Sequence, residues 1–398
     1  MFSTAYATTM RFAQRMNHLG TETAFEVLAR ARALEAKGRE IIHLEIGEPD
    51  FDTPENIKHA GIRAIEAGFT HYGPSAGMPE AREAVAQYVS AQRGVSVDPQ
   101  QVVITPGAKP IIFFTVLALL NPGDEVIYPD PGFPIYESMV DYVGATRVPI
   151  ALREADGFSI DPDRLESLVT SKTKLVIINS PHNPTGAILA RETIARLSEL
   201  AVKHDFYVLS DEIYSRIMYE GEHVTPYAYP GMPERTIILD GHSKAYAMTG
   251  WRLGYGVMPK EMALKVAKLN TNCNSCTASF TQIAGIEALR GSQDSVTRMV
   301  QEFRVRRDLI VEGLNRIPGF RCHRPAGAFY VFPDITGTGR ASKEMENHLM
   351  DKAGVAVLSG TAFGAHGEGF IRLSYANSQA NIRRALEKIA ASMSGKAS

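Results

Sequence analysis

Apolar residues recur along the chain at helix spacing in some segments and gather in short β-rich runs in others. The spacing of three and four residues runs through residues 24–34, before Gly38, and through residues 81–89, which predicts two helices. Thr53 and Pro54 predict the cap and first turn of another helix. Six β-rich runs alternate with helical stretches, at residues 102–105, 125–128, 175–179, 207–210, 236–239 and 254–257. This alternation predicts an α/β fold built on a parallel sheet.

The pattern changes near residue 290, where a long charged helix is expected at residues 299–314. β-rich pieces follow at residues 328–332 and 370–374, and a last helix runs from Ile382 to Met393. We expect a large domain of residues 46–289 and a smaller α+β domain formed by both chain ends, residues 1–45 and 290–398. Ligands of parallel α/β sheets bind at the carboxyl ends of the strands, so we expect the site there.

Composition narrows the classes of partner. The chain has 398 residues, of which 44% are hydrophobic, and 42 basic against 44 acidic side chains give a net charge of -2. This balance gives the chain no overall positive charge that would attract nucleic acid or an anionic membrane, and it favours a small-molecule ligand. The longest apolar run, at residues 111–120, is shorter than the roughly 20 residues of a membrane span. We therefore expect no membrane and no nucleic-acid partner.

Cysteine and histidine usage bears on location and metal binding. Cys273, Cys276 and Cys322 are too few for a disulfide framework, which favours a reducing, cytoplasmic location. One CxxC pair without a second pair does not make a zinc site, and the histidines lack ligand spacing, so we expect no metal. His182 and His242 flank the candidate site described next, and we interpret both as supporting residues.

Four polar segments follow the predicted strands and could carry chemistry. TPGAK at 105–109 precedes an apolar helix, where backbone N–H groups and the helix dipole favour an anion. NSPHNPTG follows at 179–186, SDEIY at 210–214, and GHSK at 241–244 with Arg252 shortly after. Each alone has an ordinary reading as a turn, a helix cap or a solvated lysine. Together they supply what a pyridoxal phosphate site needs: an anion site, a Schiff-base lysine, a carboxylate for the pyridinium nitrogen and donors for the ring phenolate.

At this point the sequence resembles the class I aminotransferases of the aspartate aminotransferase family, which belong to the fold type I pyridoxal phosphate enzymes. The shared motifs run in order along nearly the whole chain: GEPDF at 47–51, YGPSAG at 72–77, NPTG at 183–186, SDEIY at 210–214, SK at 243–244 and RLSY at 372–375. The resemblance implies a large domain with a mostly parallel central sheet flanked by helices, together with the smaller α+β domain. It also implies a transaminase.

The resemblance assigns a role to each matching residue. Lys244 would form the Schiff base and carry the proton between Cα and the cofactor's C4′, and Asp211 would keep the pyridine nitrogen protonated. Tyr214 and Asn183 would hydrogen-bond the phenolic oxygen, and Phe133 would stack on the ring. The remaining cofactor contacts it implies are Gly107, Ala108, Lys109, Ser243 and Arg252, with Tyr72 reaching in from the neighbouring subunit of a homodimer.

Substrate contacts follow from the same resemblance. Arg372 would grip the α-carboxylate with help from Gly47 and Asn183, and Lys109 could meet the distal carboxylate of a dicarboxylic substrate. The donor would be an L-amino acid of the aspartate, glutamate or aromatic type, and the acceptor a 2-oxo acid such as 2-oxoglutarate, in a ping-pong mechanism. One departure is Gly241, where many members carry a serine that binds the phosphate.

Two alternative functions stay open at this stage. A β-elimination (C–S) lyase would use the same Lys244, Asp211 and Arg372. GPSAG at 73–77 satisfies G-x-S-x-G, so a serine hydrolase using Ser75 is a remote alternative, although the preceding residues are short of strand character. The charged stretch 304–308 predicts a solvated helix face.

Overall fold

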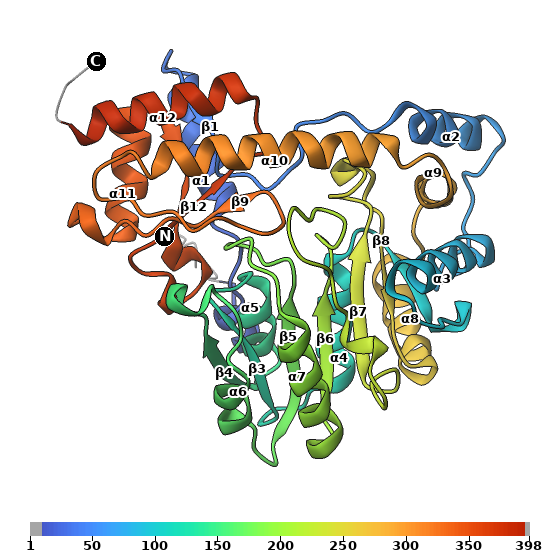
Figure 1. Ribbon diagram of the computed structural model, residues 1–398. Helices are drawn as coiled ribbons and strands as arrows, with labels where there is room; N and C mark the ends of the chain where they lie inside the picture. The colour runs from blue at the N-terminus through green and yellow to red at the C-terminus, as the bar shows by residue number, and fades with distance from the viewer. Residues whose placement is uncertain (1–9, 395–398) are drawn as a thin grey trace, which may run out of the picture.

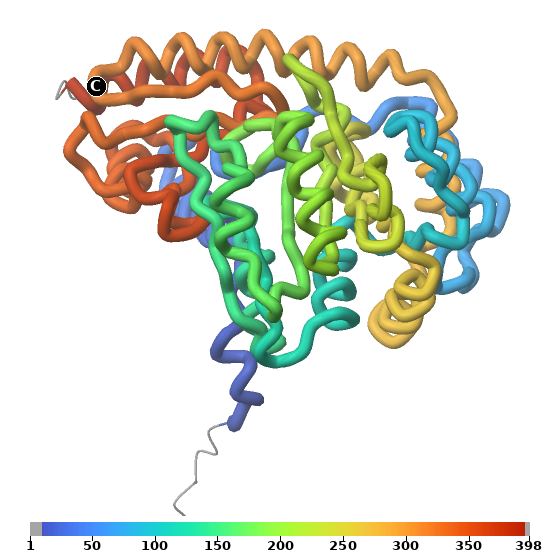
Figure 2. The backbone as a smooth tube through the Cα atoms, turned by 60° about the horizontal axis from the view of Figure 1, so that its bottom comes forward, coloured from blue at the N-terminus to red at the C-terminus, as the bar shows by residue number. Residues whose placement is uncertain are grey.

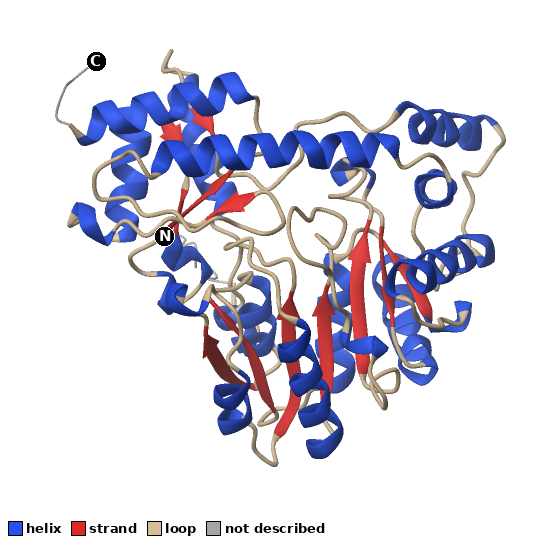
Figure 3. Cartoon of the chain, in the orientation of Figure 1, coloured by secondary structure: helices blue, strands red, loops and turns tan. Residues whose placement is uncertain are grey.

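The computed structural model describes residues 10–394 and has a seven-stranded sheet at its centre, with helices on both faces (Figures 1 and 3). In order across the sheet, the strands are β2 (Val102–Thr105), β8 (Gly254–Val257), β7 (Thr236–Gly241), β6 (Tyr207–Asp211), β5 (Thr173–Asn179), β3 (Glu125–Asp130) and β4 (Thr146–Ala151). The six β-rich runs expected from the sequence are all strands. The seventh, β4, was missed because it is an edge strand with exposed Thr146 and Arg147 and an internal Pro149.

The sheet is mostly, not wholly, parallel. Strand β8 runs antiparallel to both of its neighbours, β2 and β7, and the other strands are parallel, which confirms the expectation of a mostly parallel sheet. Its glycines let other segments approach closely. A Cβ on Gly254 would lie 2.2 Å from the Ala108 nitrogen. A Cβ on Gly241 would lie 2.9 Å from the Gly254 Cα. A serine at position 241 would therefore require the backbone of β8 to shift.

Alternating residues of the central strands feed two apolar layers. On β5, Leu175 and Ile177 pack with helices α4 and α8, whereas Val176 and Ile178 pack with α6 and α7. The helices around the sheet are α2 (Glu55–Glu66), α3 (Pro79–Arg93), α4 (Lys109–Leu119), α5 (Ile135–Tyr142), α6 (Pro162–Leu168), α7 (Arg191–His204), α8 (Lys260–Asn274) and α9 (Ser279–Arg290). Both faces of the sheet are thus covered, and its strand ends remain for a ligand.

A second group of elements lies above the carboxyl ends of the strands (Figure 1). It contains a three-stranded antiparallel sheet of β11 (Leu358–Ser359), β12 (Ile371–Ser374) and β9 (Tyr330–Val331), and helices α10 (Asp294–Leu314), α11 (Ser342–His348) and α12 (Gln379–Met393). Strand β1 (Ile42–His43), which follows α1 (Ala24–Glu35), pairs in parallel with β10 (Val355–Ala356).

The proposed domain division stays a prediction, favoured by the β1–β10 pairing, which joins segments near the two chain ends. Residues 1–9 and 395–398 of that division lie outside the described residues. Seen from another side, the dark blue segment after residue 10 leads away from the body of the molecule (Figure 2). Its apolar side chains Met10 and Phe12 are exposed.

Two expectations about local structure are wrong. Arg306 and Arg307 on α10 are 6% and 1% exposed, not solvated. Arg306 pairs with Asp50 at 2.6 Å, and its guanidinium lies 4.9 Å from the Phe51 ring centroid. Partners from distant segments, Asp50 for Arg306 and Glu220 for Arg307, hold these positions, and the local charge pattern does not reveal them.

Thr53 does not cap α2. Its hydroxyl instead donates to the Ala247 carbonyl at 2.6 Å and accepts from the Trp251 indole at 3.0 Å.

Within residues 10–394, no helix has both the length and the apolar character needed to cross a membrane. No cluster of His, Cys, Asp or Glu within the same range could hold a metal ion. The three cysteines are free thiols.

Candidate active site

A cavity of about 460 Å³ opens at the carboxyl ends of the central strands, a size typical of small-molecule sites. Most of the residues expected at the site line it: Gly47, Ala108, Lys109, Phe133, Asn183, Asp211, Tyr214, Ser243, Lys244, Arg252 and Arg372. They come from distant segments, and Gly47 and Arg372 are 325 positions apart. Gly107 lies just behind the wall, and Tyr72 lies outside the cavity, where it is 89% exposed.

Lys244 follows strand β7 and is partly buried. Its Nζ donates to the Gly47 carbonyl at 2.5 Å. Burial lowers the pKa of Lys244 to about 8; the carboxylates of Glu48 and Glu22 oppose the shift, and the charges of Arg372 and Lys109 add to it. A lysine with this pKa is partly a free amine near neutral pH. Such an amine can bind an aldehyde or move a proton.

Asp211 ends strand β6 and faces the cavity, and no cation of residues 10–394 pairs with it. Oδ2 accepts from the Tyr136 hydroxyl at 2.7 Å and Oδ1 from the Ile213 amide at 3.2 Å. Burial raises the pKa of Asp211 to about 7 even though both hydrogen bonds favour the ionised form. A buried carboxylate in this state is suited to a cationic ligand group, such as a protonated ring nitrogen.

The side-chain amide of Asn179, at the end of β5, positions Asn183. The Asn179 side chain donates to the Asp211 carbonyl at 3.0 Å and accepts from the Asn183 amide at 2.8 Å. Asn179 therefore couples the ends of β5 and β6 to the loop that carries Asn183. The Tyr214 hydroxyl shares a hydrogen bond of 2.7 Å with the Tyr330 hydroxyl.

Arg372, on β12, is 4% exposed and forms no ion pair with any carboxylate in residues 10–394. One guanidinium nitrogen donates to Asn183 Oδ1 at 3.1 Å, another donates to the Glu45 carbonyl, and Nε has no partner among the described residues. The Tyr330 ring centroid lies 4.5 Å away. Burial lowers the pKa of Arg372, and the charges of Glu22 and Glu45, neither of which pairs with it, oppose this shift only in part. An arginine buried in this way is ready for a carboxylate ligand.

The turn before α4 offers a site for a phosphate. Helix α4 starts at Lys109, so its N-terminal amides and dipole face the cavity through Ala108. A Cβ on Gly107 would lie 2.2 Å from Arg252 Nη2, so the guanidinium rests directly on this turn. Arg252 has a left-handed φ of 51° and donates to the Thr249 carbonyl at 2.8 Å.

These donors fit pyridoxal phosphate. A phosphate, a ring nitrogen and an aldehyde need an anion site, a buried carboxylate and a partly neutral lysine, and one cavity presents all three. Two further residues expected to contact the cofactor also line the cavity: Phe133, whose ring packs edge-on against Tyr136 at 5.6 Å, and Ser243 beside the lysine.

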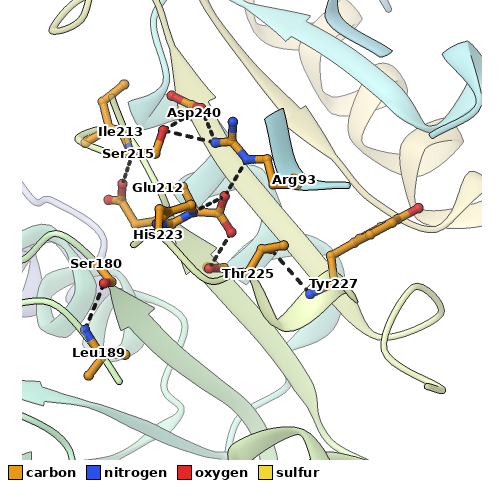
Figure 4. Close-up of polar contacts among 12 residues, drawn as sticks. Arg93, Ser180, Leu189, Glu212, Ile213, Ser215, His223, Thr225, Tyr227 and Asp240 are labelled. Atoms are coloured by element: carbon orange, nitrogen blue, oxygen red, sulfur yellow. Dashed lines mark hydrogen bonds and ion pairs between the residues drawn. The ribbon is translucent and has the colours of Figure 1, made fainter. Parts of the chain in front are cut away.

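A buried ionic network supports the site from behind (Figure 4). Arg93, at the end of α3, pairs with Glu212 at 3.0 Å and with Asp240 at 2.7 Å. Glu212 also contacts His223 at 2.8 Å. Burial opposes ionisation, but the charges of His223 and Arg93 prevail and lower the pKa of Glu212 to about 2. The network therefore fixes the residues next to Asp211 and shortly before Lys244.

Sequence reasoning missed several residues that line or support the cavity. Tyr330 and Tyr136 are tyrosines of apolar segments, and no local pattern separates them from core residues. Glu22 and Phe25 come from the segment around the start of α1 and line the cavity wall. The two histidines near the motifs, His182 and His242, are buried but do not line it.

Ser75 does not line the cavity either, and residues 69–72 before it form no strand. The nucleophile elbow that a serine hydrolase needs is a strand followed by a sharp turn and a helix. The structure offers no support for that alternative.

The fold and the cavity together define a fold type I enzyme that depends on pyridoxal phosphate. Comparison with known proteins narrows the class. The model of the aminotransferase class I and II family matches residues 39–389. The chain is 42% identical to an aspartate aminotransferase of Pyrococcus horikoshii over 372 residues, which cover 93% of this chain and 94% of the relative. It is 41% identical to the aspartate/prephenate aminotransferase of Thermus thermophilus over 380 residues, covering 95% and 97%.

The solved structure of the Thermus thermophilus aspartate aminotransferase with maleate aligns with a TM-score of 0.93 at 40% identity, covering 96% of this chain and all of that one. The chain belongs to the class I and II aminotransferase family. It is a transaminase that uses pyridoxal phosphate, and its substrates are amino acids and 2-oxo acids.

Proposed function

We propose that the protein moves the amino group of an L-amino acid of the aspartate, glutamate or aromatic type to a 2-oxo acid such as 2-oxoglutarate, by a ping-pong mechanism in which Lys244 binds the cofactor covalently. The observation that carries the proposal is Arg372, which is buried in the cavity that also holds Lys244 and pairs with no carboxylate among the described residues. The names of the two relatives, aspartate aminotransferase and aspartate/prephenate aminotransferase, support the range of donors.

When bound, pyridoxal phosphate supplies an aldehyde and a ring that accepts the electron pair left at Cα. The residues of this chain do the rest. Arg372 holds the α-carboxylate by a fork of N–H donors and so orients the Cα hydrogen. Lys244, with its pKa near 8, takes that proton on Nζ and returns it at the neighbouring carbon. Asp211 keeps the ring nitrogen protonated, and Arg252 with the Gly107–Ala108 turn binds the phosphate.

We further propose that the working unit is a homodimer in which Tyr72 completes the neighbouring site. Tyr72 is exposed and lies outside the cavity of its own chain. Exposed apolar side chains Met10, Phe12 and Leu264 are of the kind that a second copy would cover. A cytoplasmic location stays a prediction from the free cysteines.

The first test is the absorption spectrum of the dialysed protein before and after L-glutamate is added without an oxo acid. We expect the yellow band of the lysine-bound cofactor to convert to the pyridoxamine form. Lys244→Ala should lose the yellow band and nearly all amino transfer, because no other lysine of residues 10–394 has its Nζ at the Gly47 carbonyl. Lys260→Ala, which changes an exposed lysine at the start of α8, is the matched control. Amino transfer retained by Lys244→Ala would refute the assignment, and release of ammonia and pyruvate from a cysteine derivative would favour the lyase.

A further inference from the structure

One wall of the cavity carries an ion pair that none of the proposed steps uses. The Glu22 carboxylate contacts Lys109 Nζ, and both side chains line the cavity. The pair is partly open to solvent, with side-chain exposures of 21% for Glu22 and 41% for Lys109. Lys109 Nζ also lies 5.4 Å from the Phe133 ring centroid. The wall thus combines a cation, its counter-ion and an aromatic ring.

The pair lies within electrostatic reach of both groups that would hold a substrate. The negative charge of Glu22 raises the pKa of Lys244 and acts in the same sense on Arg372, and the charge of Lys109 lowers the pKa of Lys244. A substrate anchored by its α-carboxylate at Arg372, with Cα beside Lys244, can therefore direct its side chain toward the pair. Glu22 belongs to the segment just before α1, not to the rigid strand ends.

A transaminase of the proposed kind must accept two side chains of different charge in one cavity. A lone ammonium next to an uncharged side chain would lose hydration without gaining a partner. A fixed cation without a counter-ion would therefore favour acidic substrates and disfavour the others. Ion pairs as exposed as Lys109–Glu22 are weak, so a substrate carboxylate can replace Glu22 with little loss.

We infer that Glu22 is a specificity-determining residue: it neutralises Lys109 when an uncharged side chain occupies the cavity and gives Lys109 up when an acidic side chain enters. This inference rests on the proposed function and extends it to substrate class. The chain is then a dual-specificity transaminase, which uses acidic donors and uncharged donors such as phenylalanine or alanine. Its selectivity is set by the competition between the Glu22 carboxylate and the substrate carboxylate for the ammonium of Lys109.

The test compares kcat/KM for aspartate with kcat/KM for the better of phenylalanine and alanine, from single-turnover absorption changes of the holoenzyme. Glu22→Gln should raise the ratio of acidic to uncharged efficiency at least about tenfold, and Lys109→Met should lower it by a similar factor. The double variant should return toward the wild-type ratio, since both charges are gone. Glu137→Gln, which removes a carboxylate from the exposed Arg147 pair, is the matched control and should leave the ratio unchanged.

Binding of maleate, an unreactive dicarboxylate, gives a second readout that needs no turnover. Its dissociation constant should fall in Glu22→Gln and rise in Lys109→Met. A ratio within about twofold of wild type in Glu22→Gln, or a wild type that uses only one of the two donor classes, overturns the inference while leaving transamination intact. A holoenzyme that shows no half-reaction with any of these amino acids overturns the proposed function instead.

Discussion

Asp211 makes the cofactor site a source of instability in the cofactor-free protein, and this can be measured. Burial raises its pKa from 3.8 to about 7. The folded state therefore holds the proton more tightly than the unfolded chain, and its stabilising effect is complete below pH 3.8 and lost as the pH rises through 7. A shift of about 3 units corresponds to roughly 4 kcal/mol of unfolding free energy. This penalty is the cost of leaving the buried carboxylate without a cation.

Asp211→Asn removes the ionisable group and keeps the shape. We expect the cofactor-free variant to exceed the wild type by about 4 kcal/mol in unfolding free energy at pH 8 and by about 2 kcal/mol at pH 5, where the wild type is still mostly protonated. Urea unfolding can be followed by the fluorescence of the single tryptophan, Trp251. Asp156→Asn changes an exposed aspartate and should show no pH-dependent gain.

The same variant should lose most amino transfer, because asparagine cannot keep the ring nitrogen protonated. A gain in stability that is equal at pH 5 and pH 8 would refute the reasoning, since only titration of Asp211 makes the gain depend on pH. Unimpaired amino transfer would refute the role given to the carboxylate.

Two further predictions concern the anchoring groups. Arg372→Lys replaces the forked guanidinium by a point charge and should reduce kcat/KM about 10- to 100-fold for every donor alike in steady-state assays. This factor corresponds to a charged hydrogen bond worth roughly 1.5 to 3 kcal/mol. A loss confined to acidic donors would contradict the role of Arg372 at the α-carboxylate. Tyr72→Ala should raise the cofactor dissociation constant several-fold in equilibrium titrations, with the proposed dimer unchanged in sedimentation. Unaltered affinity would argue against its place in the neighbouring site.

The sequence predicts the strand ends well because their chemistry is local. Asn183, Asp211 and Lys244 each follow a β-rich run, and the alternation of runs and helices brings those ends to one edge. The orientation of β8 could not be read in the same way. Whether a strand runs parallel or antiparallel depends on the path of the connections, and residues 254–257 have the same composition in either case.

Contacts between distant segments could not be predicted from the sequence either. Tyr330 reaches Tyr214 from 116 positions away, and Glu22 reaches Lys109 from 87. Neither residue stands in a pattern that differs from an ordinary core strand or helix start. The buried state of Arg307 has the same cause, since its partner Glu220 lies 87 positions earlier and the Tyr219 ring belongs to the same loop.

The network around Arg93 links the chemistry of the site to the stability of the fold. Glu212 directly follows Asp211 at the end of β6, and Asp240 precedes Lys244 by four positions on β7, so one guanidinium fixes both strand ends. A buried carboxylate that loses its partner costs about 3 to 5 kcal/mol, so these ends hold their register strongly. Arg93 itself lies outside the cavity. The positions of Asp211 and Lys244 are therefore set by charges outside the cavity, whereas Glu22 and Lys109 lie in the cavity wall, away from this network.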